Sequence, residues 1–263
     1  LRAWLRNASK NPKEILATFQ KTLAQGSLGK QEAIEQLFQF ASNSIAPATS
    51  VSPEVKQSVY AATFAAGNDL LATLKDDARL ELFMSVFLPQ FGQYDEALAY
   101  LQKSSSHSPN KQQILFQIGA LYLQRGDAKS ALPVLKKAFD LAPAYAEARI
   151  MYATGLYYAG QVAQGDALLV EGFGTVLVDD NRLLQVYTNL KRFDRVIGVW
   201  QERVKKSPDD FNLHLGLAAA YFSARNNAAA ITELQRVAQL NPTMAGQVES
   251  LITQIKNGTL KPQ

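Results

Sequence analysis

The stretch that decides the fold is QQILFQIGALYLQRGDAKSALPVLKKAFDLAP, residues 112–143. A second stretch, FNLHLGLAAAYFSARNNAAAITELQRVAQLNP at residues 211–242, carries large, small and aromatic residues at the same offsets. In each, a turn separates two segments whose apolar residues recur three and four positions apart, as on one face of a helix. Each stretch therefore predicts two helices that fold back on one another.

The same pattern extends to either side and predicts five units of about 34 residues. They span residues 78–111, 112–145, 146–176, 177–210 and 211–244. Gly92 and Gly126 end the first helix of their units, where a left-handed conformation costs glycine little. Lys191 and Arg192 stand in the place of this glycine in the fourth unit. The third unit is about three residues short and lacks a closing proline, so we expect an irregularity there.

The order of these residues resembles the tetratricopeptide repeat, a helix-turn-helix unit of 34 residues. The resemblance implies an all-α fold, a right-handed superhelical solenoid of antiparallel helix pairs. Residues 245–257 read as a capping helix that covers the last apolar face, and residues 258–263 as a tail. Residues 1–77 read as a divergent helical region packed on the solenoid. Its helices are expected to begin at Pro12 and Lys30, with a third from Pro53 to about Leu74.

The family resemblance also implies a concave groove lined by the first helix of each unit, which would hold a protein or peptide ligand. The expected lining residues are Gln113, Phe116, Ala120, Leu123, Gln124, Met151, Thr154, Tyr157, Tyr158, Asn181, Arg182, Gln185, Asn189, Ala219 and Phe222. Most are apolar, aromatic or amide side chains, with no lysine to clamp a carboxylate. Asn181 and Arg182 would form one polar spot.

Composition excludes several functions. The net charge of +4 is spread along the chain without a basic stripe, so we expect no nucleic-acid partner. The chain has no cysteine, which excludes disulfides and cysteine-bound metal centres. No uninterrupted apolar run approaches the ~18 residues that a membrane span needs. We expect no cofactor.

The candidate catalytic groups are better explained as structural. Acidic pairs occur at residues 76–77, 179–180 and 209–210, each at the start of a predicted helix, where carboxylates cap free N–H groups. The two histidines, His107 and His214, lie in different units, and His214 takes a packing position. No nucleophile elbow, phosphate loop or zinc-protease motif occurs. We expect no catalytic or metal-binding residues and no enzyme activity in this chain.

A narrower resemblance concerns the order of the pieces. Asn11-Pro12 with Phe19 and Leu23, Gly29-Lys30-Gln31-Glu32, the run from Ser108 to Phe116, Arg182-Leu183-Leu184 and Lys191-Arg192-Phe193-Asp194 resemble C-terminal tails of bacterial O-antigen ligase-like membrane proteins. That resemblance implies an interaction or assembly module tethered to the inner membrane by an upstream segment, on a side of the membrane left open. The full-length protein would be a glycan ligase or polymerase. The start at Leu1 rather than Met favours a piece excised from such a protein.

Three functions remain open at this stage. The first is a non-catalytic module that recruits a protein partner or self-associates. The second is a glycan-contacting accessory domain with Tyr157 and Tyr158 as a stacking platform. The third is a free-standing soluble, cytoplasmic adaptor.

Overall fold

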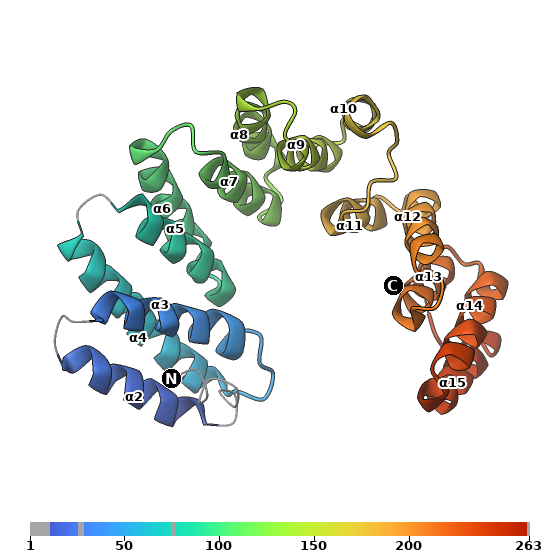
Figure 1. Ribbon diagram of the computed structural model, residues 1–263, viewed down its shortest axis with the longest axis horizontal. Helices are drawn as coiled ribbons and strands as arrows, with labels where there is room; N and C mark the ends of the chain where they lie inside the picture. The colour runs from blue at the N-terminus through green and yellow to red at the C-terminus, as the bar shows by residue number, and fades with distance from the viewer. Residues whose placement is uncertain (1–10, 26–28, 75–76, 262–263) are drawn as a thin grey trace. The chain divides into compact units, whose positions relative to one another are not determined.

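The computed structural model describes residues 11–25, 29–74 and 77–261. The chain start at Leu1, the acidic residue Asp76 and the end of the predicted tail lie outside these ranges. The chain divides into two compact units, Leu1–Ala142 and Pro143–Gln263, which are treated separately below. All regular structure in the described ranges is helical, so the predicted all-α fold of antiparallel helix pairs is confirmed (Figure 1).

The first unit contains the helices α2 (Pro12–Ala24), α3 (Lys30–Phe40), η1 (Ala41–Ile45), α4 (Pro53–Thr73), α5 (Ala78–Phe87), η2 (Leu88–Phe91), α6 (Tyr94–His107), α7 (Gln112–Gln124) and α8 (Ala128–Leu141). Helices α2, α3 and α4 pack on one another, and α4 packs on α5. Proline opens α2 and α4 at the position where its missing N–H is not needed. The helix predicted to begin at Lys30 is present, and it continues beyond Phe40 as a π-helical turn, Ala41–Ile45.

One apolar core runs through this unit from α2 to α7. It includes Phe19 of α2, Ile34 and Leu37 of α3, Met84 of α5 and Ile114 of α7, all nearly inaccessible to solvent. The N-terminal helices and the first two helix pairs therefore share a continuous core. This arrangement is what burial of each helix's single apolar stripe requires.

The second unit contains α9 (Ala146–Tyr158), α10 (Val162–Phe173), α11 (Asn181–Asn189), α12 (Phe193–Lys206), α13 (Phe211–Ser223), α14 (Asn227–Leu240), η3 (Pro242–Met244) and α15 (Ala245–Lys256). Helix α15 packs on α14 through Val248 and Ile255, and its outward face carries Glu249 and Thr253. It is the predicted capping helix, which meets the last pair with an apolar face and solvent with a polar one.

The same turn closes the first helix of every pair. In each turn one residue has positive φ, namely Gly92, Gly126, Gly160, Lys191 and Arg225. The N–H of this residue donates to the carbonyl three residues earlier, as Gly126 does to Leu123. The N–H of the following residue donates to the carbonyl five residues earlier, as Asp127 does to Tyr122. This pairing satisfies carbonyls that the helix end would leave unpaired. Two of the five left-handed positions are therefore held by residues with a side chain.

The predicted irregularity lies where α10 ends. Gly174 adopts positive φ, and the chain then runs without helix to Asp180, the N-cap of α11. Arg149 of α9 packs against this end of α10 and donates from Nη1 to the carbonyl of Leu168 at 2.9 Å. Gly172 leaves the room that the Arg149 side chain occupies. A buried arginine thus fills space beside the shortened helix.

Candidate partner-binding surface

The expected groove residues of the first compact unit, Leu1–Ala142, lie on α7. Gln113, Ala120 and Gln124 are exposed, whereas Phe116 and Leu123 are half-buried. Gln124 Nε2 lies 3.4 Å from the hydroxyl of Tyr94 on α6. We call the side of a first helix that carries these positions its first-helix face.

Helix α5 has a first-helix face that the sequence analysis overlooked. Leu82 and Val86 stand 34 residues before Phe116 and Ala120, and Val86 is 45% exposed. Applying the repeat offset to the first predicted unit would have found both residues. The α5 face therefore carries apolar residues at the positions of Phe116 and Ala120 on α7.

The structure brings the expected residues of α9 and α11 together. Arg182 on α11 reaches Glu147 on α9, with 2.9 Å between Nη2 and Oε2, and Asn189 donates to the hydroxyl of Tyr158 at 3.2 Å. Gln185 is exposed between these two contacts. The two first-helix faces thus form one surface, on which the amides Gln185 and Asn189 lie beside Tyr158 and the Arg182–Glu147 ion pair.

Arg182 is committed to partners within the chain. Besides Glu147 it binds Asp180, with 2.6 Å between Nη2 and Oδ2. The hydrogen bonds that Arg182 donates to Glu147 and Asp180 raise the pKa of its guanidinium further above its ordinary value, although burial opposes this. Asn181 is also engaged, because its Oδ1 accepts from Arg203 at 2.9 Å. The expected polar spot is present, but its positive charge is already neutralised.

Three expected groove residues are buried instead. Met151, Thr154 and Tyr157 are at most 5% exposed. The Thr154 hydroxyl bonds to the carbonyl of Ile150, and Tyr157 donates to Asp166 on α10 at 2.7 Å. A stacking platform of Tyr157 with Tyr158 does not fit this burial, because only the ring of Tyr158 is open to a ligand. Helix α9 packs against α10 and α11, and the Tyr157 hydroxyl lies 3.4 Å from Nη1 of Arg195 on α12.

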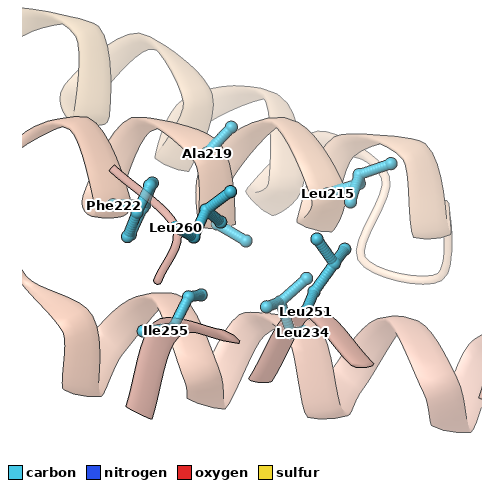
Figure 2. Close-up of a pocket in the computed structure, with 8 residues that line it drawn as sticks. Leu215, Ala219, Phe222, Leu234, Leu251, Ile255 and Leu260 are labelled. Carbon is cyan, nitrogen blue, oxygen red and sulfur yellow. The ribbon is translucent and has the colours of Figure 1, made fainter. Parts of the chain in front are cut away.

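The face of α13 leads into an apolar pocket. Ala219 is exposed and Phe222 is half-buried. Both line a cleft of about 160 Å³ formed by α13, α14, α15 and Leu260 (Figure 2). The sequence reasoning placed Ala219 and Phe222 on the groove but did not foresee the pocket, since the pocket depends on how three helices meet.

The acidic pairs serve the helix starts and ion pairs. Asp77, Asp180 and Asp210 accept hydrogen bonds from the first N–H groups of α5, α11 and α13. Asp179 pairs with Arg203 at 2.7 Å and Asp209 with Arg236 at 3.2 Å. Capping therefore explains one member of each pair.

Both histidines contact a glutamate. His214 is buried, with Nδ1 2.6 Å from Glu233 and Nε2 2.9 Å from the carbonyl of Pro208. His107 lies 3.3 Å from the carboxylate of Glu81, which is fully buried and also 2.9 Å from Lys103. Among the described residues no group of three or more metal-ligating side chains occurs. None of the described helices is both long and apolar enough to cross a membrane.

Comparison with known proteins finds the tetratricopeptide repeat family, whose model matches residues 90–146 and 190–245. A comparison with curated proteins gives no match. Several solved structures are similar in part. YrrB, described as a TPR protein with an unusual peptide-binding site, is 16% identical over 67% of this chain and 93% of its own, with a TM-score of 0.41.

Two further structures show the same level of similarity. MamA from residue 41 to its end, from Desulfovibrio magneticus RS-1, is 22% identical over 64% of this chain and 97% of its own, with a TM-score of 0.46. TTC0263, a thermophilic TPR protein of Thermus thermophilus, is 17% identical over 68% of this chain and 98% of its own, with a TM-score of 0.44.

Proposed function

We propose, from the premise that residues 90–146 and 190–245 are tetratricopeptide repeats, that this chain is a non-catalytic scaffold whose first-helix faces hold protein or peptide partners. Repeats of this kind typically bind other proteins and carry out no chemistry. The observation that carries the proposal is the exposure of Gln113, Ala120 and Gln124 on α7 and of Gln185 on α11. Ala120 and Gln185 stand at equivalent repeat positions, because each lies six residues before the positive-φ residue of its turn.

The first-helix faces of the two compact units differ in the side chains that they expose. In the first compact unit α5 and α7 carry exposed or half-buried apolar side chains on this face, and α7 adds the exposed amides Gln113 and Gln124. In the second compact unit α11 exposes the amides Asn181, Gln185 and Asn189, and α9 exposes Tyr158 at one end. An amphipathic helix suits the first surface, and an extended peptide whose backbone bonds to amides suits the second.

Site-specific photo-crosslinking tests the proposal. A photoreactive amino acid is placed at Gln124 or Gln185, and as matched controls at Gln102 on α6 or Glu202 on α12, which are exposed on second helices. We expect discrete crosslinked products only from the first pair of positions. Self-association through the same faces would crosslink one copy to another there. Equal products from all four positions would overturn the proposal.

We further propose that the chain is the C-terminal domain of a bacterial O-antigen ligase-like membrane protein. The support is the order of Asn11-Pro12, Gly29-Lys30-Gln31-Glu32 and the run from Ser108 to Phe116 in this sequence. In that setting the scaffold would be held at the inner membrane by the preceding part of the protein and would recruit assembly partners to a glycan ligase.

Sequencing the gene upstream of the codon for Leu1 tests this second proposal. We expect several segments of ~20 apolar residues in the translated sequence. A start codon shortly before Leu1 would contradict it and favour the free-standing adaptor. The crosslinking result does not depend on this outcome.

A further inference from the structure

The pocket beside the capping helix has features of a built binding site. Its lining is apolar throughout and comprises Leu215, Ala218, Ala219, Phe222, Leu234, Leu251, Ile255 and Leu260. Its volume is about 160 Å³. An apolar cavity of about 150 Å³ in another protein stays dry and takes up benzene, so this pocket has room for one ring-sized group.

The pocket occupies repeat positions that belong to the proposed partner-binding faces elsewhere in the chain. Leu215, Ala219 and Phe222 stand at the same offsets in their unit as Phe116, Ala120 and Leu123 do in theirs, because residue 211 corresponds to residue 112. In the last unit the capping helix α15 lies across from these positions and walls the pocket with Leu251 and Ile255 (Figure 2). The last first-helix face is thus folded into a pocket rather than left flat.

Leu260 indicates what the pocket accepts. The segment after α15 leaves the helix at Gly258, and the N–H groups of Thr259 and Leu260 both bond to the carbonyl of Gln254. This turn places the Leu260 side chain at the pocket between Phe222 and Ile255 (Figure 2). A branched aliphatic side chain on a non-helical backbone is therefore a group that the site already accommodates.

Three exposed cations lie close in sequence to residues that line the pocket. Arg225 follows Phe222 by three residues, Lys256 follows Ile255, and Lys261 follows Leu260. Within the described part of the chain no ion pair engages them, and the one acidic residue of α14, Glu233, contacts His214. Glu249 precedes Leu251 by two residues, which turns it to the opposite side of α15.

We propose that this pocket binds one aromatic or branched aliphatic side chain of a partner peptide that carries an acidic residue beside it. The apolar side chain enters next to Leu260, and the acidic residue meets Arg225, Lys256 and Lys261. The proposal deepens the proposed scaffold function, because it names the chemistry of one partner segment. It concerns a site on α13 and α15, apart from the faces of α7 and α11.

Methyl NMR of the whole chain tests the proposal with three synthetic probes. They are acetyl-Glu-Phe-Glu-amide, acetyl-Glu-Ala-Glu-amide and acetyl-Lys-Phe-Lys-amide. We expect the first probe to shift the methyl signals of Leu215, Leu251 and Ile255 with a dissociation constant on the order of 1 mM, as suits so small a ligand. The alanine and lysine probes should bind at least about tenfold more weakly.

Two variants locate the site. Ala219→Trp should fill the pocket and remove the shifts, whereas Thr253→Trp, on the exposed face of α15, should leave them unchanged. The probe comparison on the unaltered chain stands even if Ala219→Trp fails to fold. Absence of methyl shifts with the first probe, or equal shifts with all three, would overturn the proposal. Crosslinking at Gln124 and Gln185 reports separately on the scaffold function.

Discussion

Arg195 on α12 and Asp166 on α10 form a bidentate ion pair, with 2.6 Å between Nη1 and Oδ1 and 2.7 Å between Nη2 and Oδ2. The Arg195 side chain is 9% exposed, and the Tyr157 hydroxyl donates to the same Oδ1. The guanidinium also lies over the ring of Tyr187, 5.2 Å from its centroid. This network joins four helices around the shortened third unit, where the regular stacking of pairs is interrupted.

Loss of this ion pair should destabilise the chain. Arg195→Ala leaves Asp166 and the buried Tyr157 hydroxyl without their cation, so we expect the free energy of unfolding to fall by ~2 kcal/mol. Urea denaturation followed by circular dichroism measures the change. Arg192→Ala is the matched control, because the Arg192–Asp194 pair is exposed and should contribute less than ~0.5 kcal/mol. Equal effects of the two variants would contradict this account.

The same carboxylate should give the fold a dependence on pH. Burial opposes ionisation of Asp166, but the hydrogen bonds from Arg195 and Tyr157 outweigh it, and the pKa of Asp166 is lowered. A lowered pKa in the folded state stabilises the fold above the unfolded-state pKa, ~3.9, and this stability is lost as the pH falls through the folded value.

When the pH is lowered from about 6 to about 3, we therefore expect the free energy of unfolding to fall less in Asp166→Asn than in the unaltered chain. This range spans the ordinary pKa of aspartate. Urea titrations at the two pH values measure the difference. Asp140→Asn is a suitable control, since its pair with Lys136 is exposed. An unchanged pH dependence in Asp166→Asn would assign the acid sensitivity to other groups.

Gly165 should not tolerate a side chain. A Cβ atom there would lie 2.9 Å from Cε1 and 3.0 Å from Cζ of Tyr157, a ring that is fully buried and hydrogen-bonded. We expect Gly165→Ala to lower the free energy of unfolding by ~1–3 kcal/mol. Gly246→Ala in α15 meets nothing within 4 Å and should raise it by ~0.5–1 kcal/mol, as the helix propensity of alanine implies. Thermal melting of both variants tests this opposition in sign.

The left-handed turns at Lys191 and Arg225 should be improved by glycine. Their φ values are 55° and 61°, where a side chain costs ~1 kcal/mol and glycine costs none. Lys191→Gly and Arg225→Gly should each raise the melting temperature by a few degrees. Gly126→Ala, at the equivalent turn with φ of 75°, should lower it. A fall in stability for both glycine variants would mean that the two side chains matter more than the backbone.

Much of the fold follows from local pattern. The expected helix starts at Pro12, Lys30 and Pro53 agree with the structure, as do the turns at Gly92 and Gly126. Helix periodicity, proline at the first turn and glycine after the last turn act within a few residues, so one sequence suffices to read them. The π-helical turn at Ala41–Ile45 was not foreseen, because nothing in local composition distinguishes it from an α-helix.

The candidate surface follows from the sequence only in part. Repeat offsets identify which positions belong to a first-helix face, and Gln113, Gln124 and Gln185 are exposed as expected. The same offsets place Tyr157 on that face, yet its ring is buried against Gly165 and Asp166. Exposure depends on which side chains of neighbouring helices cover a position, and the repeat offsets do not specify this.

The sequence by itself determined the helices, their pairing and the capping helix, because these depend on contacts between residues at most ~34 positions apart in a repeating pattern. The tertiary structure decided which charged side chains form ion pairs within the chain, such as Arg182 with Glu147 and Arg195 with Asp166. It also decided that Leu215, Ala219 and Phe222 meet Leu251, Ile255 and Leu260 around a pocket. Ion pairs and cavities depend on the separation of side chains in three dimensions, which periodicity along the chain does not specify.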